Sequence, residues 1–106
     1  MHDWIHLTGR WGMDTKNPAR ADLKKALSEL FDSPEDDEHP DAWLTCGSEN
    51  GPLYTVNIFS SGYAIFTVYD DADMRTELQR KEISNINHES GLLLWENLIK
   101  ENYEGI

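Results

Sequence analysis

Two histidines near the start of the chain, His2 and His6, stand four residues apart and would share one side of a helix, as in some zinc sites. Gly9 and Gly12 follow closely and make a helix a poor fit here. No third ligand at a suitable spacing is identifiable. We therefore expect surface histidines and no metal, and a small metal-binding protein that uses His2 and His6 is kept as an alternative.

A second set, His39, Asp41 and Cys46, contains the groups of a base, an orienting carboxylate and a nucleophile. No catalytic family signature accompanies them, and free cysteines are usually buried. We expect a loop histidine before Pro40 and a half-buried strand cysteine. The prediction is a protein with no catalytic residues that is not an enzyme, with an enzyme using His39 or Cys46 as the less favoured alternative.

Acidic residues dominate the charge, because 20 Asp and Glu stand against 9 Lys and Arg and give a net charge of −11. A field of this sign repels phosphate backbones and anionic membranes and attracts basic surfaces. We therefore expect a basic protein partner and neither direct nucleic-acid binding nor membrane binding. The acidic run at 70–73 lacks the glycine and the glutamate of an EF-hand loop, so no cofactor is predicted.

The length of 106 residues predicts one domain, 1–106. The single cysteine cannot form an internal disulfide, and the sequence has no apolar run near 18 residues and no charged-then-apolar leader. These features favour a reducing cytoplasm.

Apolar periodicity predicts two amphipathic helices. Asn17-Pro18 is a helix-start signal, and apolar residues at three- and four-residue steps follow it until Pro34, which predicts a helix over residues 17–32. A second helix is predicted from Asn87 to a stop at Gly105. Its apolar stripe consists of Leu92, Leu93, Trp95, Leu98, Ile99 and Tyr103.

Three alternating runs between the helices, at 42–47, 53–60 and 63–69, predict an antiparallel β-meander. Residues 1–16 fit a short strand or an arm over the body better than a helix, and residues 70–86 fit either an irregular excursion or a short edge strand. The predicted fold is a single α+β domain in which two amphipathic helices pack on one face of the meander.

Alternation divides the residues of the last two predicted strands between two faces. The face expected to meet the helices carries Tyr54, Val56, Ile58, Phe66 and Val68. The other face carries Phe59, Tyr63, Ile65 and Tyr69, and it is mixed rather than charged, which is unusual for a face that only meets water. The alternative is that the N-terminal segment, with Trp4 and Trp11, folds over this face and buries it.

Two acidic segments stand beside these strands in the sequence. Residues 32–41 contain six acids and no basic residue, which predicts a solvated loop, and residues 70–73 add a second patch. Acidic margins around an aromatic face are typical of a protein interface. The predicted binding surface consists of Glu35, Asp36, Asp37, Glu38, Asp41, Phe59, Tyr63, Ile65, Tyr69, Asp70, Asp71 and Asp73.

The pattern most resembles immunity protein family 1 of bacterial polymorphic-toxin systems. The resemblance runs from NP (17–18) and LSEL (27–30) through PDAWL (40–44) to GPLYTVNIF (51–59), GYAIF (62–66) and the segment around Trp95. It implies a cytoplasmic antidote that binds a cognate secreted toxin domain, commonly one that attacks nucleic acid, and blocks it by occlusion without catalysis. A protein-interaction adaptor unconnected with toxins is the alternative.

Overall fold

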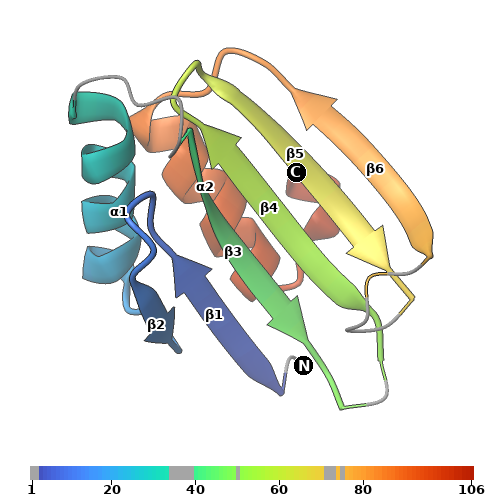
Figure 1. The fold of residues 1–106 in the computed structure, drawn as a ribbon. Helices are drawn as coiled ribbons and strands as arrows, with labels where there is room; N and C mark the ends of the chain where they lie inside the picture. The colour runs from blue at the N-terminus through green and yellow to red at the C-terminus, as the bar shows by residue number, and fades with distance from the viewer. Residues whose placement is uncertain (1–2, 34–39, 50, 71–73, 75) are drawn as a thin grey trace.

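The computed structural model describes residues 3–33, 40–49, 51–70, 74 and 76–106, which form one antiparallel sheet and two α-helices (Figure 1). In chain order the elements are β1 (Trp4–Thr8), β2 (Asp14–Lys16), α1 (Arg20–Asp32), β3 (Asp41–Gly47), β4 (Leu53–Phe59), β5 (Tyr63–Tyr69), β6 (Glu77–Ile83), α2 (His88–Ile99) and a 3-10 turn (Tyr103–Gly105). The strand order in the sheet is β2-β1-β3-β4-β5-β6. A meander from β3 to β6 is therefore extended by an N-terminal hairpin.

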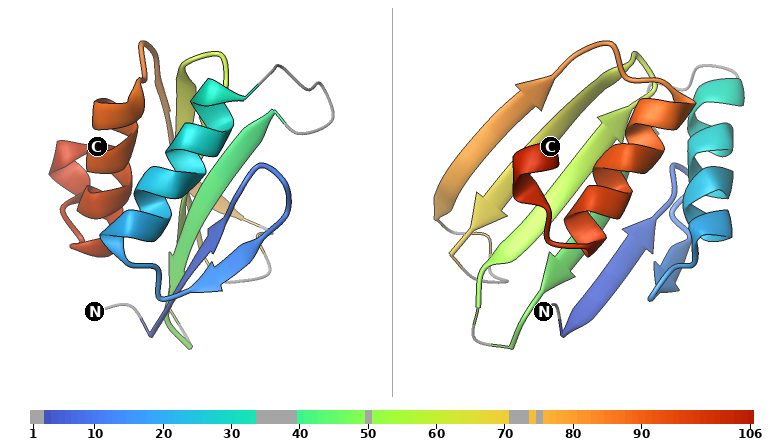
Figure 2. Two further views of the ribbon diagram at one scale, coloured as in Figure 1. Left: turned by 90° about the vertical axis from the view of Figure 1, so that its left-hand side faces the viewer. Right: turned by 180° about the vertical axis from the view of Figure 1, so that it is seen from behind.

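Both helices lie on the same side of the sheet, as the view from behind makes plain (Figure 2). Helix α2 contacts β3 and β4, and α1 packs beside α2 and against β3. This arrangement confirms the predicted α+β fold with two helices on one sheet face. None of the helices in the described ranges is long and apolar enough to cross a membrane.

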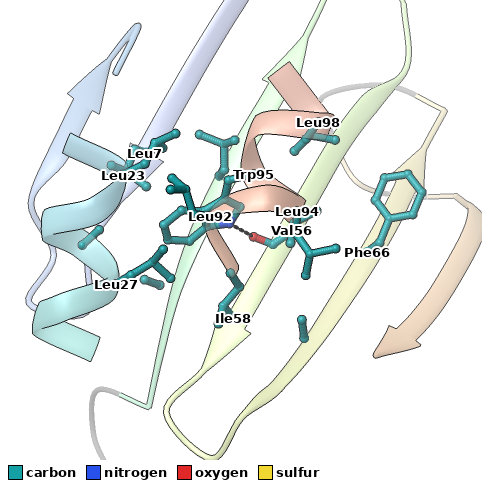
Figure 3. Close-up of a cluster of buried hydrophobic side chains, with 14 of the residues drawn as sticks. Leu7, Leu23, Leu27, Val56, Ile58, Phe66, Leu92, Leu94, Trp95 and Leu98 are labelled. Atoms are coloured by element: carbon teal, nitrogen blue, oxygen red, sulfur yellow. Dashed lines mark hydrogen bonds between the residues drawn. The ribbon is translucent and has the colours of Figure 1, made fainter. Parts of the chain in front are cut away.

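The core forms between the helices and the sheet, and Trp95 of α2 lies fully buried at its centre. The indole Nε1 of Trp95 donates a hydrogen bond of 3.1 Å to the backbone oxygen of Val56 in β4 (Figure 3). Gly91 lets α2 approach closely, because a Cβ there would lie 2.9 Å from the Leu27 side chain. The predicted core residues are confirmed, since Val56, Ile58, Phe66 and Val68 are buried and Tyr54 packs against the cluster.

The predicted start of the first helix is wrong by three residues. The backbone N–H of Asn17 donates to the oxygen of Ile5, and Asn17 has a φ of 49°, so this residue turns the chain out of the hairpin. Helix α1 begins at Arg20 after Ala19, whose N–H donates to the Asp22 carboxylate at 2.8 Å. An acid inside the first turn thus replaces the expected asparagine cap.

The second helix begins where the sequence predicts, with Asn87 as its cap, but the predicted end at Gly105 is wrong. Helix α2 ends at Ile99, Glu101 has a φ of 60°, and the N–H of Asn102 donates back to the oxygen of Asn97. The chain then folds over the sheet, where Tyr103 stacks on Tyr54 at 4.6 Å between ring centroids.

The predicted apolar stripe of this helix is also wrong at one position. Leu93 is 57 % exposed, whereas Leu94 is 6 % exposed. The covered stripe contains Leu94 because it runs through residues 91, 94, 95 and 98, at steps of three and four.

The N-terminal segment 1–16 and the segment 70–86, for which the sequence allows two alternatives each, both contain strands. Residues 4–8 enter the sheet between β2 and β3 instead of crossing over it, and residues 77–83 form the edge strand β6. The register of β6 shifts at Val68/Tyr69 of β5, as at a β-bulge. Of the two alternatives that the sequence leaves open for each segment, the structure therefore has the strand in both cases.

Candidate protein-binding surface

The sheet face opposite the helices, called here the open face, is covered by no other element among the described residues and is turned toward the viewer in Figure 1. Directly paired residues of neighbouring strands point to the same side, so the register gives its composition. Its large apolar and aromatic side chains with some exposed surface are Trp4, Trp43, Phe59, Tyr63, Ile65 and Tyr69, whereas Leu53, which pairs with Gly47 and Tyr69 on the same side, is buried. Each of these six is partly buried and keeps some exposed surface.

A row of threonines runs across the middle of the open face, since Thr45 pairs with Thr55 and Thr55 pairs with Thr67. All three are buried although no helix covers them, and the Thr45 and Thr55 hydroxyls lie 3.5 Å apart. The larger neighbours on both sides cover this row. The open face therefore offers a flat, neutral floor between two sets of larger side chains.

The predicted face residues of β4 and β5 are placed correctly. Phe59 of β4 lies opposite Tyr63 of β5, and Ile65 and Tyr69 follow on the same side. Trp4 also lies on this face, but its indole rests on Gly47, where an added Cβ would come within 2.5 Å of the ring. The N-terminal segment thus contributes a side chain to the open face and does not bury it.

Tyr63 is held by contacts on two sides. Its ring lies 5.9 Å from that of Phe59, and its hydroxyl donates a hydrogen bond to the Glu82 carboxylate of β6. This bond raises the pKa of Tyr63 and lowers the pKa of Glu82. Arg80 lies 3.5 Å from Glu82 and 3.9 Å from Glu77, so the β5–β6 side of the open face carries a connected polar chain.

Asp41 begins β3 and is oriented by a neighbour, because the side-chain amide of Asn57 donates a 2.9 Å hydrogen bond to its Oδ2. Asn57 pairs directly with Trp43, which places the three side chains together on the open face. Trp43 and Asn57 are absent from the predicted binding surface, although alternation already places Asn57 on the side opposite the core. The alternation of Ala42, Leu44 and Cys46 toward the core could have indicated that Trp43 points to the other side.

The two predicted acidic margins lie at opposite ends of the strands. Asp41 starts β3 and the exposed Asp70 follows the end of β5, and both strands run antiparallel to β4 between them. A seven-residue strand is about 20 Å long, so these carboxylates mark two ends of the open face. The other predicted acids, Glu35, Asp36, Asp37, Glu38, Asp71 and Asp73, lie outside the described residues.

Of the alternative chemical residues, the two that the structure describes, His6 and Cys46, are not brought together. Cys46 is fully buried on the helix side, and desolvation, with a smaller contribution from Glu101, raises the pKa of its thiol to about 12. His6 lies on the open face, edge-on to Trp4 at 5.8 Å, so the sheet separates it from Cys46. His2 and His39 lie outside the described residues, and within those residues no three His, Cys, Asp or Glu side chains are grouped to hold a metal.

The helix side carries a hollow at the junction of α1 and α2. It has a volume of about 220 Å³ and is lined by Lys24, Leu27, Ser28, His88, Glu89 and Leu92. Small-molecule sites usually enclose roughly 300–1,000 Å³. The geometry therefore fits contact with a macromolecule across a surface better than capture of a small ligand.

Comparison of the chain with protein-family models, with curated proteins and with solved structures finds no match in any of the three.

Proposed function

We propose that this chain is an immunity protein of the family 1 type, which binds a cognate toxin domain in the cytoplasm and blocks it by occlusion without catalysis. The observation that carries the proposal is the open face, where six partly buried apolar and aromatic side chains surround a neutral floor on a chain of net charge −11. The resemblance of the segments at 17–18, 27–30, 40–44, 51–59, 62–66 and around Trp95 supports the choice of family.

The area of the open face is somewhat smaller than the area that each partner buries in a standard protein–protein interface. Six strands at about 4.8 Å spacing and about 20 Å length give a face of roughly 500 Å². A stable complex buries about 800 Å² on each partner, so loops at the strand ends would supply the rest. Side chains already held in place, such as Tyr63 between Phe59 and Glu82, lose little freedom on binding.

The charge fits a basic partner. A toxin domain that binds nucleic acid presents a positive surface, and a chain of net charge −11 would attract that surface from a distance. Occlusion then needs no reactive group in the antidote. The buried Cys46 thiol, with its raised pKa, is consistent with a role in packing.

Co-expression with the toxin domain encoded beside this chain's gene tests the proposal. We expect a stoichiometric complex on gel filtration and survival of cells that the toxin alone kills. A toxin domain from an unrelated system is the control and should neither co-elute nor be neutralised. A neighbouring gene of another kind whose product forms the complex would overturn the proposal in favour of an interaction adaptor.

A further inference from the structure

We propose that Asp41, Trp43 and Asn57 form a subsite on the open face that receives an arginine side chain of a protein partner. The inference rests on the proposed function for its choice of a protein partner. It deepens that function, because it names the side chain that the partner inserts and the place where it binds.

The first observation concerns the four tryptophans. The Trp95 indole donates to the Val56 oxygen in the core, the Trp4 ring rests on Gly47, and the Trp11 ring lies 4.9 Å from the Arg10 guanidinium carbon. Among the residues that the structure describes, Trp43 has no ring, cation or hydrogen-bond partner of this kind. A partly exposed indole in the sheet is thus left without the contact that its three counterparts have.

The second observation concerns Asp41. Its carboxylate is partly buried and accepts a hydrogen bond from the Asn57 amide, but no Lys or Arg of the described ranges forms an ion pair with it. A carboxylate has room for about four hydrogen bonds, so the Asn57 bond fixes its orientation and leaves acceptors for a second donor group. Within the described part of the chain, Asp41 is therefore an oriented carboxylate with no cationic partner.

The third observation is the arrangement of the two groups. Asp41 and Trp43 are two residues apart on one face of β3, a separation of about 7 Å along the strand. A guanidinium can stack on an indole and direct its N–H fork at a nearby carboxylate, whereas an ammonium group lacks the planar shape for both contacts. Arg10 over Trp11 provides the guanidinium–indole contact within this chain, with its N–H groups on the backbone oxygen of Leu30 in place of a carboxylate.

Titration of ¹⁵N-labelled protein with hexa-arginine and hexa-lysine peptides at low salt tests the subsite. We expect the indole N–H of Trp43 and the side-chain amide of Asn57 to shift, with hexa-arginine binding about threefold or more tighter than hexa-lysine. Asp41→Asn and Trp43→Leu should each remove this preference. Should Trp43→Leu fail to fold, Asn57→Ala, which releases the carboxylate, should weaken the preference in its place.

Glu77→Gln is the matched control, because it removes one negative charge from the same face but at β6, away from Trp43. It should lower the affinity for both peptides equally and leave the arginine preference intact. Equal binding of the two peptides, or equal effects of Asp41→Asn and Glu77→Gln on the preference, would overturn the subsite. The titration contains no toxin, so a negative result rejects the arginine subsite but not the immunity function. Failure to form a complex with the toxin would reject the immunity function but not the arginine subsite.

Discussion

The two faces of the same sheet are built from alternate residues of the same strands, yet they have different compositions. On the helix side, Val56, Ile58 and Phe66 are buried with aliphatic and aromatic partners from the helices. On the open face, Asn57, Ile65 and Tyr69 are only partly buried and have polar or charged neighbours. The helix-side residues are used for folding, whereas several residues of the open face keep exposed surface and hydrogen-bonding groups, which the proposed binding role requires.

The largest expected effect is on the helix side. Phe66→Ala removes a ring that is 2 % exposed and leaves a cavity against Tyr103, so it should lower the free energy of unfolding by about 3–5 kcal/mol. Urea unfolding checks this value. Ile65→Ala, one residue earlier on the open face, is the control and should cost much less, and equal losses at both positions would erase the distinction between the faces.

The reactivity of the Cys46 thiol tests whether the helix side of β3 is buried. Its thiol pKa of about 12 means that the native protein should react with iodoacetamide at pH 8 about a hundredfold or more slowly than the unfolded chain. Because the folded-state pKa is raised above the ordinary value of 9.0, this group stabilises the fold below pH 9 and its contribution declines as pH rises toward 12. Rapid labelling of folded protein would place Cys46 outside the core.

The open-face tyrosines should separate affinity from stability. Tyr63→Ala and Tyr69→Ala should shift the melting temperature by only a few degrees, yet each should weaken toxin binding by about 1–3 kcal/mol if it is an anchor. Calorimetry of melting and of binding on the same samples checks both values. A large loss of stability with unchanged affinity of the folded fraction would assign the tyrosines to the fold alone.

The smallest expected effect belongs to the acidic segment before β3. Changing Glu35, Asp36, Asp37 and Glu38 to amides, with Asp41 kept because the proposed subsite gives it a direct contact, should slow association with a basic partner by about tenfold and change dissociation less, if these charges steer the partner at long range. Stopped-flow rates at two salt concentrations check this, since added salt should mimic the substitutions. Association that is indifferent to both treatments would make the segment ordinary solvated surface.

The sequence predicts most of the strands because their periodicity is strong. The run at 63–69 coincides with β5, and the runs at 42–47 and 53–60 differ from β3 and β4 by one residue. The sequence does not decide between a strand and a loop for β6, because polar residues occur on both of its faces. Lys81 lies opposite Phe66 on the helix side, where its ammonium contacts the backbone oxygen of Ile106. A charged edge strand lacks the alternation of apolar and polar residues by which strands are recognised in a sequence.

The helix ends could not be predicted because tertiary contacts decide them. Asn17 is used by the hairpin instead of by α1, and Glu101 adopts a positive φ without glycine at the end of α2. For the candidate site, alternation within β4 and β5 was sufficient to place Tyr63 and Tyr69. It could not reveal Trp43 beside Asn57, because that neighbourhood depends on the pairing of β3 with β4.

The most direct test of the open face as the binding surface is to block each side of the molecule in turn. Ile65→Cys on the open face and Leu93→Cys on the outer side of α2 each introduce a thiol that a bulky maleimide can modify, while native Cys46 is buried and protonated. Affinity for the toxin is then measured by calorimetry. Modification at position 65 should abolish the complex, and modification at position 93 should change the affinity by no more than about twofold. Loss of binding only after modification at position 93 would contradict the account and move the interface to the helices.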